Sequence, residues 1–78
     1  MESKFMVIMD KLAKRFRYEV ANVDPLHPDI ECDTTFLRRY TKAYDYWKIY
    51  MMLPKDHVYK THYLCLLADI LAEMGEVI

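Results

Sequence analysis

A single glycine, Gly75, occurs among the 78 residues, and this scarcity restricts the fold more than any other feature. Loops that bind phosphate or dinucleotides need several glycines where the backbone approaches the ligand, so both classes are excluded. A sheet rich in hairpins needs Asn-Gly or Asp-Gly turns, and the sequence contains neither pair. The one glycine therefore favours a fold built from helices.

Apolar side chains recur three and four residues apart in three segments, which the chain's three prolines separate. This periodicity predicts an all-α fold, a compact three-helix bundle. We expect helices over residues 3–20, 34–52 and 55–75. The chain is about half the length at which chains usually divide, so we expect a single helical domain over residues 1–78.

The helix ends carry recognisable signals. Ser3 is a suitable N-cap for the first helix, and Asp33 or Thr34 is suitable for the second. Pro54 disfavours helical geometry at the residue before it, and Gly75 suits the position after a helix C-terminus. The alternative is that the second and third segments form one long helix kinked at Pro54.

Each helix presents an apolar stripe that we expect to form the core. The stripe of the first helix contains Phe5, Ile8, Met9, Leu12, Phe16, Val20 and Val23. The stripe of the second contains Phe36, Tyr40, Ala43, Tyr44, Trp47, Tyr50 and Met51. The stripe of the third contains Tyr59, Tyr63, Leu64, Leu66, Leu67, Ile70, Leu71 and Met74. We expect the rings of Tyr40, Tyr44 and Trp47 to hold the first and third helices.

The second and third helices carry more apolar surface than one small bundle needs. On the second helix, Tyr46, Ile49 and Leu53 lie outside the core stripe, among charged side chains. Such a surplus has three explanations, which are self-association, a heterologous partner, or scattered exposed residues without a role. We expect a dimer, and the other two explanations stay open.

The outer side of the second helix has the composition of a protein interface, since interfaces favour Tyr, Trp, Met and Arg. The predicted partner-binding residues are Arg39, Lys42, Tyr46, Ile49 and Leu53. The alternative is that Tyr46 and Ile49 cover the loop that contains Pro25 and Pro28.

Nucleic-acid binding is the second hypothesis. A basic stripe on the first two helices could neutralise phosphates, and Tyr18 and Tyr46 could stack on bases. Its candidate residues are Lys11, Lys14, Arg15, Arg17 and Arg38, followed by Arg39 and Lys42. The net charge of −1 and the segment after Pro54, which has Tyr and Leu in place of base-reading side chains, argue against this hypothesis.

The acidic side chains Asp69, Glu73 and Glu76 gather at the C-terminal end of the third helix, which is unfavourable for the helix dipole. They indicate contact with basic side chains, either Lys11 and Arg15 of another subunit or a basic partner. The alternative is a solvated helix end, because exposed like-charge pairs cost little.

The sequence offers little for metal binding or catalysis. His27, Cys32, His62 and Cys65 could surround zinc, but their spacing matches no common zinc motif. His62, Cys65 and Asp69 share a helical face, where no cleft would enclose a substrate. We therefore expect no catalytic residue, no metal and no cofactor.

The same sequence indicates a reduced, cytoplasmic environment. Two cysteines are fewer than small secreted scaffolds carry, and Lys4, Asp10 and Lys11 interrupt any signal peptide. The longest apolar stretch, residues 49–53, is too short to span a bilayer. A membrane-surface role is not expected, because the first helix's stripe is explained as core and the chain has no net positive charge.

Taken as a whole, the sequence predicts a small cytoplasmic protein that is not an enzyme and binds another protein. An inhibitor, an adaptor or an antitoxin-like factor fits this description. The size of the chain favours an origin in a phage or another mobile element.

Overall fold

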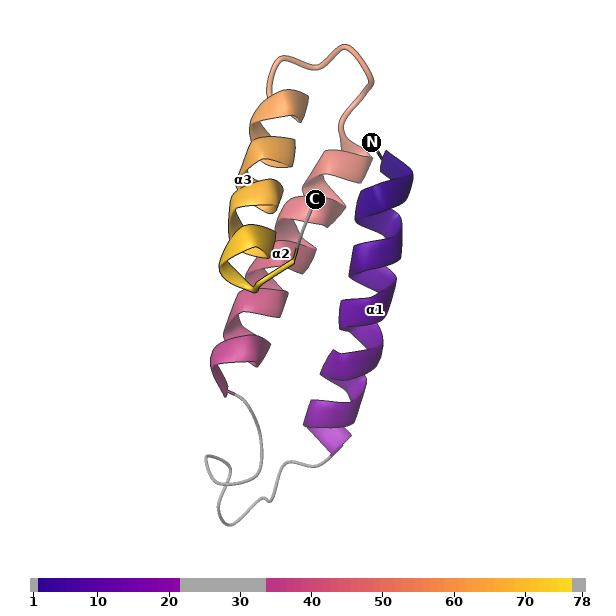
Figure 1. Cartoon of the computed structure of the whole chain (residues 1–78). Coiled ribbons are helices and arrows are strands. Elements are labelled where there is room, and N and C mark those ends of the chain that lie inside the picture. Colours follow the sequence, from indigo (N-terminus) through magenta and orange to yellow (C-terminus); the bar gives the residue numbers. More distant parts are fainter. Residues whose placement is uncertain (1, 22–33, 77–78) are drawn as a thin grey trace. The chain divides into compact units, whose positions relative to one another are not determined.

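The computed structural model of the chain describes residues 2–21 and 34–76. This part contains three helices and no strand, and the helices are α1 (Glu2–Ala21), α2 (Thr34–Met52) and α3 (Lys60–Glu73) (Figure 1). The predicted all-α class with three helices is therefore confirmed. The expectations for Val23, for the Asp33 cap and for the proline loop fall outside the described residues.

The chain divides into two units, residues 1–40 and 41–78, and the boundary falls within α2. The first unit contains α1 and the first two turns of α2. The second unit contains the remainder of α2 together with α3. Each unit is described by itself below.

Aromatic rings join the two helical segments of the first unit. The Phe16 and Tyr40 ring centroids lie 4.7 Å apart, and Phe36 stacks on Tyr40 at 6.1 Å. Phe5, Ile8, Met9 and Leu12 are buried as expected. Val20 was expected in the same stripe but is exposed, because the ring contact with Tyr40 is made one turn earlier, at Phe16.

The start of α1 also differs from the prediction. The helix already includes Glu2, so Ser3 lies inside the first turn and is not its N-cap.

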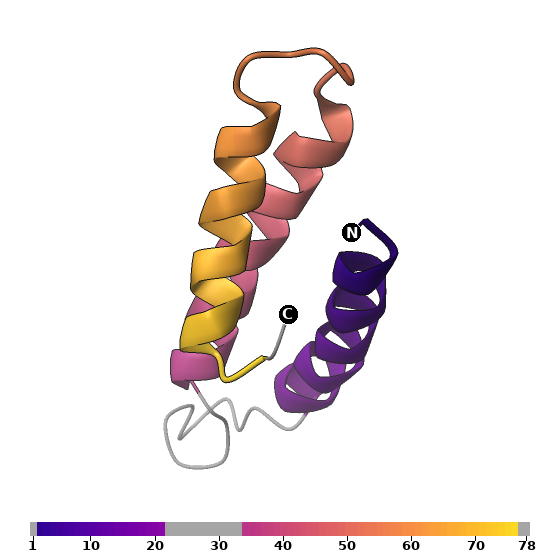
Figure 2. The same cartoon turned by 45° about the horizontal axis from the view of Figure 1, so that its top comes forward.

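In the second unit, α3 runs back antiparallel along α2 (Figure 1; Figure 2). The Tyr50 ring faces the Lys60 ammonium near the turn, and the Tyr46 ring faces that of Tyr63 further along. The two segments therefore form a helical hairpin, and the alternative of one long kinked helix is wrong.

The third helix begins at Lys60, five residues later than predicted. Two successive turns occupy the preceding residues, since the His57 N–H donates to the Pro54 carbonyl and the Lys60 N–H donates to the His57 carbonyl. The Tyr59 N–H also donates to Nδ1 of His57, at 3.1 Å. These local hydrogen bonds compete with helical ones and delay the helix start.

Lys60 links the end of α2 to the start of α3. Its Nζ donates to the Leu53 carbonyl at 2.9 Å and to the Tyr50 carbonyl at 3.2 Å. The same ammonium lies 4.5 Å from the centroid of the Tyr50 ring. Carbonyls at a helix C-terminus have no partner within the helix and carry partial negative charge, so a cation there is stabilising.

The C-terminus of α3 is closed by Gly75, as predicted. Its φ is +84°, its N–H donates to the Ala72 carbonyl, and the Glu76 N–H donates to the Leu71 carbonyl. This pair of hydrogen bonds is a Schellman motif, which needs the left-handed conformation that glycine adopts without strain.

The core stripes of the second unit are narrower than predicted. Ala43, Tyr50, Leu67, Ile70 and Leu71 are buried. The exposed exceptions are Tyr44, Met51 and Tyr59. Tyr44 and Met51 directly follow the buried residues Ala43 and Tyr50 in the sequence, so they lie at the edge of the buried face of α2. Tyr59 belongs to the turn before α3. Trp47 is half-buried and stacks on Tyr50 at 5.6 Å.

We expect Lys60→Met to lower the free energy of unfolding by about 1–2 kcal/mol, because the apolar chain keeps its packing but leaves two carbonyls without their charged donor. Urea denaturation followed by circular dichroism measures the change. Lys55→Met, at an exposed lysine of the same turn, is the control and should change stability by less than about 0.5 kcal/mol. Equal effects of the two substitutions would contradict the role assigned to Lys60.

Candidate functional site

Four of the five predicted partner-binding residues lie in the second unit. Of these, Lys42 and Tyr46 face α3 across a groove. Lys42 is exposed, and Tyr46, Ile49 and Leu53 are half-buried. Arg39 belongs to the first unit and is exposed. The chain's own third helix thus covers part of the surface that the sequence assigns to a partner, and part remains accessible.

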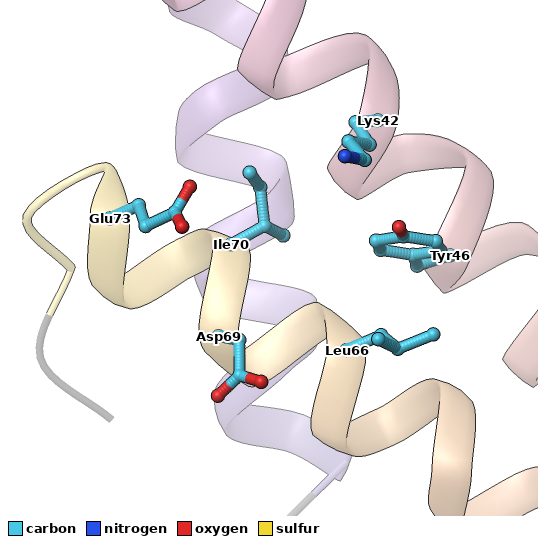
Figure 3. Close-up of a pocket in the computed structure, with 6 residues that line it drawn as sticks. All are labelled: Lys42, Tyr46, Leu66, Asp69, Ile70 and Glu73. Atoms are coloured by element: carbon cyan, nitrogen blue, oxygen red, sulfur yellow. The ribbon is translucent and has the colours of Figure 1, made fainter.

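A groove runs between α2 and α3 within the second unit (Figure 3). It has a volume of about 170 Å³ and is lined by Lys42, Tyr46, Leu66, Asp69, Ile70 and Glu73. The first two side chains come from α2 and the other four from α3. Tyr46 and Leu66 approach one another across the groove, and Ile70 completes its apolar lining.

The orientation of Tyr46 is set by a second tyrosine. The Tyr46 and Tyr63 ring centroids lie 6.3 Å apart with an interplanar angle of 50°, and Tyr63 in turn meets His62 edge-on at 5.6 Å. Such tilted arrangements suit the charge distribution of aromatic rings. The Tyr46 ring therefore lines the groove and also packs against Tyr63 of α3.

Charged groups of both signs border the apolar lining. Lys42 is exposed on α2, and Asp69 and Glu73 are exposed on α3. The sequence offered Lys11 and Arg15 of another subunit, or a basic partner, as contacts of this acidic end, with a solvated helix end as the alternative. In the structure Lys42 of the same chain lines the groove with Asp69 and Glu73.

The sequence did not connect Leu66 and Ile70 with Tyr46, because it assigned Leu66 and Ile70 to the core stripe of the third helix and Tyr46 to the outer side of the second. The connection follows from the antiparallel register, which places Tyr46 beside Leu66 and Lys42 beside Ile70. A predicted contact between Tyr50 and Lys60 could have revealed this neighbourhood, because one known contact between two antiparallel helices indicates which other residues lie opposite each other.

The groove is small for a site of chemistry. Pockets for small-molecule ligands usually measure about 300–1,000 Å³. The volume of about 170 Å³ lies below this range.

The basic residues of the second hypothesis are all exposed; they are Lys11, Lys14, Arg15, Arg17 and Arg38. Arg15 already has two contacts in the first unit. Its guanidinium lies 4.0 Å from the centroid of the Phe36 ring, and its Nε lies 3.9 Å from a carboxylate oxygen of Glu19.

The residues considered for zinc binding and catalysis are not brought into a cluster in the described part of the chain. His62, Cys65 and Asp69 are exposed on α3, and residues 2–21 and 34–76 contain no group of three potential metal ligands. His27 and Cys32 lie outside the described residues.

Comparison with known proteins adds no relative, since no protein-family model, curated protein or solved structure matches the chain. None of the helices in residues 2–21 and 34–76 combines the length and the hydropathy needed to cross a bilayer.

We expect Tyr46→Ala to lower the free energy of unfolding by about 1–2 kcal/mol, because the half-buried ring packs on Tyr63. Tyr46→Phe keeps the ring and should stay within about 0.5 kcal/mol of the wild type. Thermal denaturation followed by circular dichroism distinguishes the two variants. If Tyr46→Ala were as stable as Tyr46→Phe, the ring would have no structural role.

Proposed function

We propose that the protein is a small, non-catalytic interaction module that docks on a target protein through the outer side of α2 and the adjoining groove. The observation that supports this proposal is the groove itself. It joins two of the predicted partner-binding residues, Lys42 and Tyr46, to an apolar lining supplied by α3. The dimensions of the groove match a side chain of a partner better than a substrate.

The lining indicates what kind of side chain fits. Leu66, Ile70 and the Tyr46 ring offer contacts to an apolar stem, and the carboxylates of Asp69 and Glu73 attract a cationic end group. An arginine or a lysine on the target has both parts. An aromatic ring beside the stem adds a favourable interaction with the cation.

The remaining predicted residues extend this surface along α2. Ile49 and Leu53 continue the apolar side beyond Tyr46, and Arg39 lies at the opposite end. Docking by such a surface occludes or repositions the target without chemistry, as an inhibitor, an adaptor or an antitoxin-like factor does. We place this activity in the cytoplasm, in a homodimer that presents the surface twice, and a phage or another mobile element is the origin we favour.

Site-specific photo-crosslinking in the source cells tests the proposal. With benzoylphenylalanine at position 42, which lines the groove, we expect a discrete crosslinked protein adduct. At Thr35, an exposed position in the first turn of the same helix, we expect none. The adduct at position 42 should weaken at least about tenfold with Leu66→Gln, which places a polar group in the apolar lining.

Circular dichroism of the Leu66→Gln variant must show that the helices are retained. Absence of an adduct at position 42, or equal adducts at both positions, would contradict docking at the groove.

Nucleic-acid binding is the second candidate, and the exposure of its five basic residues supports it. Under this alternative, Lys14→Glu combined with Arg17→Glu abolishes retention on immobilised DNA at low salt. Retention of the wild type then falls steeply as salt rises, since each phosphate contact releases counterions. Lys48→Glu combined with Lys55→Glu makes the same change in net charge on the second unit and should retain binding. A wild type that is not retained at low salt would eliminate this candidate.

A further inference from the structure

The C-terminal end of α2 and the turn that follows it carry an unusual concentration of exposed apolar side chains. Met51, Met52, Val58 and Tyr59 have exposed fractions of 51, 74, 78 and 58%. We call these four residues the apolar tip. Residues 51–59, which contain all four, span the end of α2 and its connection to α3, where the chain reverses direction (Figure 1). Turns are usually polar at their ends, so this composition points to a contact that covers the tip.

Many backbone polar groups of this turn are already satisfied within the chain. Its N–H groups at Leu53, His57, Tyr59 and Lys60 all donate to internal acceptors, and Pro54 has no N–H. The Tyr50 and Leu53 carbonyls accept from Lys60 Nζ. Each of these internal hydrogen bonds lowers the cost of moving this segment out of water, because a polar group that keeps its partner loses less there.

Positive charge surrounds the apolar tip. Residues 48–62 contain Lys48, Lys55 and Lys60 with a single acidic residue, Asp56, whereas acidic residues outnumber basic ones in the whole chain. The local charge therefore differs in sign from the net charge of −1. A second copy of the chain would bring a like-charged tip against this one, so the charge favours an anionic surface over self-association.

We propose that the apolar tip inserts into the boundary between headgroups and acyl chains of an anionic membrane. The tip lies at the end of the helical hairpin of the second unit, a position that suits insertion into a bilayer. Tyr59 has an aromatic body and a polar hydroxyl, the combination that favours the membrane–water interface. Lys48 and Lys55 would meet anionic headgroups beside the inserted side chains.

This activity is separate from the groove, whose lining contains none of the tip residues. It also differs from the membrane-surface role that the sequence argued against. That role concerned the first helix and the charge of the whole chain, whereas this one concerns the turn and its local charge.

Sedimentation with vesicles tests the proposal. We expect the full chain to sediment with vesicles of phosphatidylcholine and phosphatidylserine, and at least about tenfold less with phosphatidylcholine alone. Met52→Ser combined with Val58→Ser should reduce binding to the mixed vesicles at least about tenfold. Both residues are highly exposed, so circular dichroism should show unchanged helix content.

Met6→Ser combined with Val7→Ser is the matched control, since these α1 side chains are exposed by 55 and 69% and lie outside the tip. This variant should bind vesicles like the wild type. Absence of binding by the wild type, or an equal loss in both double variants, would overturn the proposal.

Light scattering tests whether the tip instead contacts a second copy of the chain. A dimeric wild type that becomes monomeric with Met52→Ser and Val58→Ser would show that the tip covers a second copy, and would also overturn it.

Discussion

The arrangement of the two helices in the second unit depends on the contact between the Lys60 ammonium and the C-terminal end of α2. The ammonium supplies a charged donor to the Tyr50 and Leu53 carbonyls, which the helix leaves without internal partners. Because Lys60 is also the first residue of α3, this contact ties the start of one helix to the end of the other. Together with the contact between the Tyr46 and Tyr63 rings, that attachment defines the register of the helical hairpin.

Two surfaces with different chemistry result from the same hairpin. Along its length, the register brings Tyr46 and Lys42 of α2 beside Leu66 and Ile70 of α3, and a groove forms between them. At its end, the last residue of α2, Met52, and the turn residue Val58 are exposed to solvent. The groove is small, mixed in charge and suited to one side chain. The apolar tip lies at the end of the hairpin, has lysines beside it in the sequence and is suited to a surface.

Tyrosines at different depths show how one residue type serves both packing and contact. Tyr40 and Tyr50 are buried, Tyr46 and Tyr63 are half-buried at the hairpin interface, and Tyr59 is exposed at the tip. A tyrosine ring packs as an apolar body while its hydroxyl remains compatible with water. The high tyrosine content therefore does not by itself distinguish core from binding surface, and the sequence assigned Tyr59 to the core for this reason.

Local patterns in the sequence determined the all-α class, the bounds of α2 and the role of Gly75, because helix periodicity and the left-handed residue after a helix depend on neighbours in the chain. The same patterns identified Leu67, Ile70 and Leu71 as core. Only the tertiary structure decided where α3 begins and which residues of α2 it meets. Those features depend on Lys60 reaching carbonyls seven and ten residues earlier in the chain, and on a His57 side chain that accepts a backbone hydrogen bond. Helical periodicity contains no information about such contacts, since they depend on how the turn folds back in space.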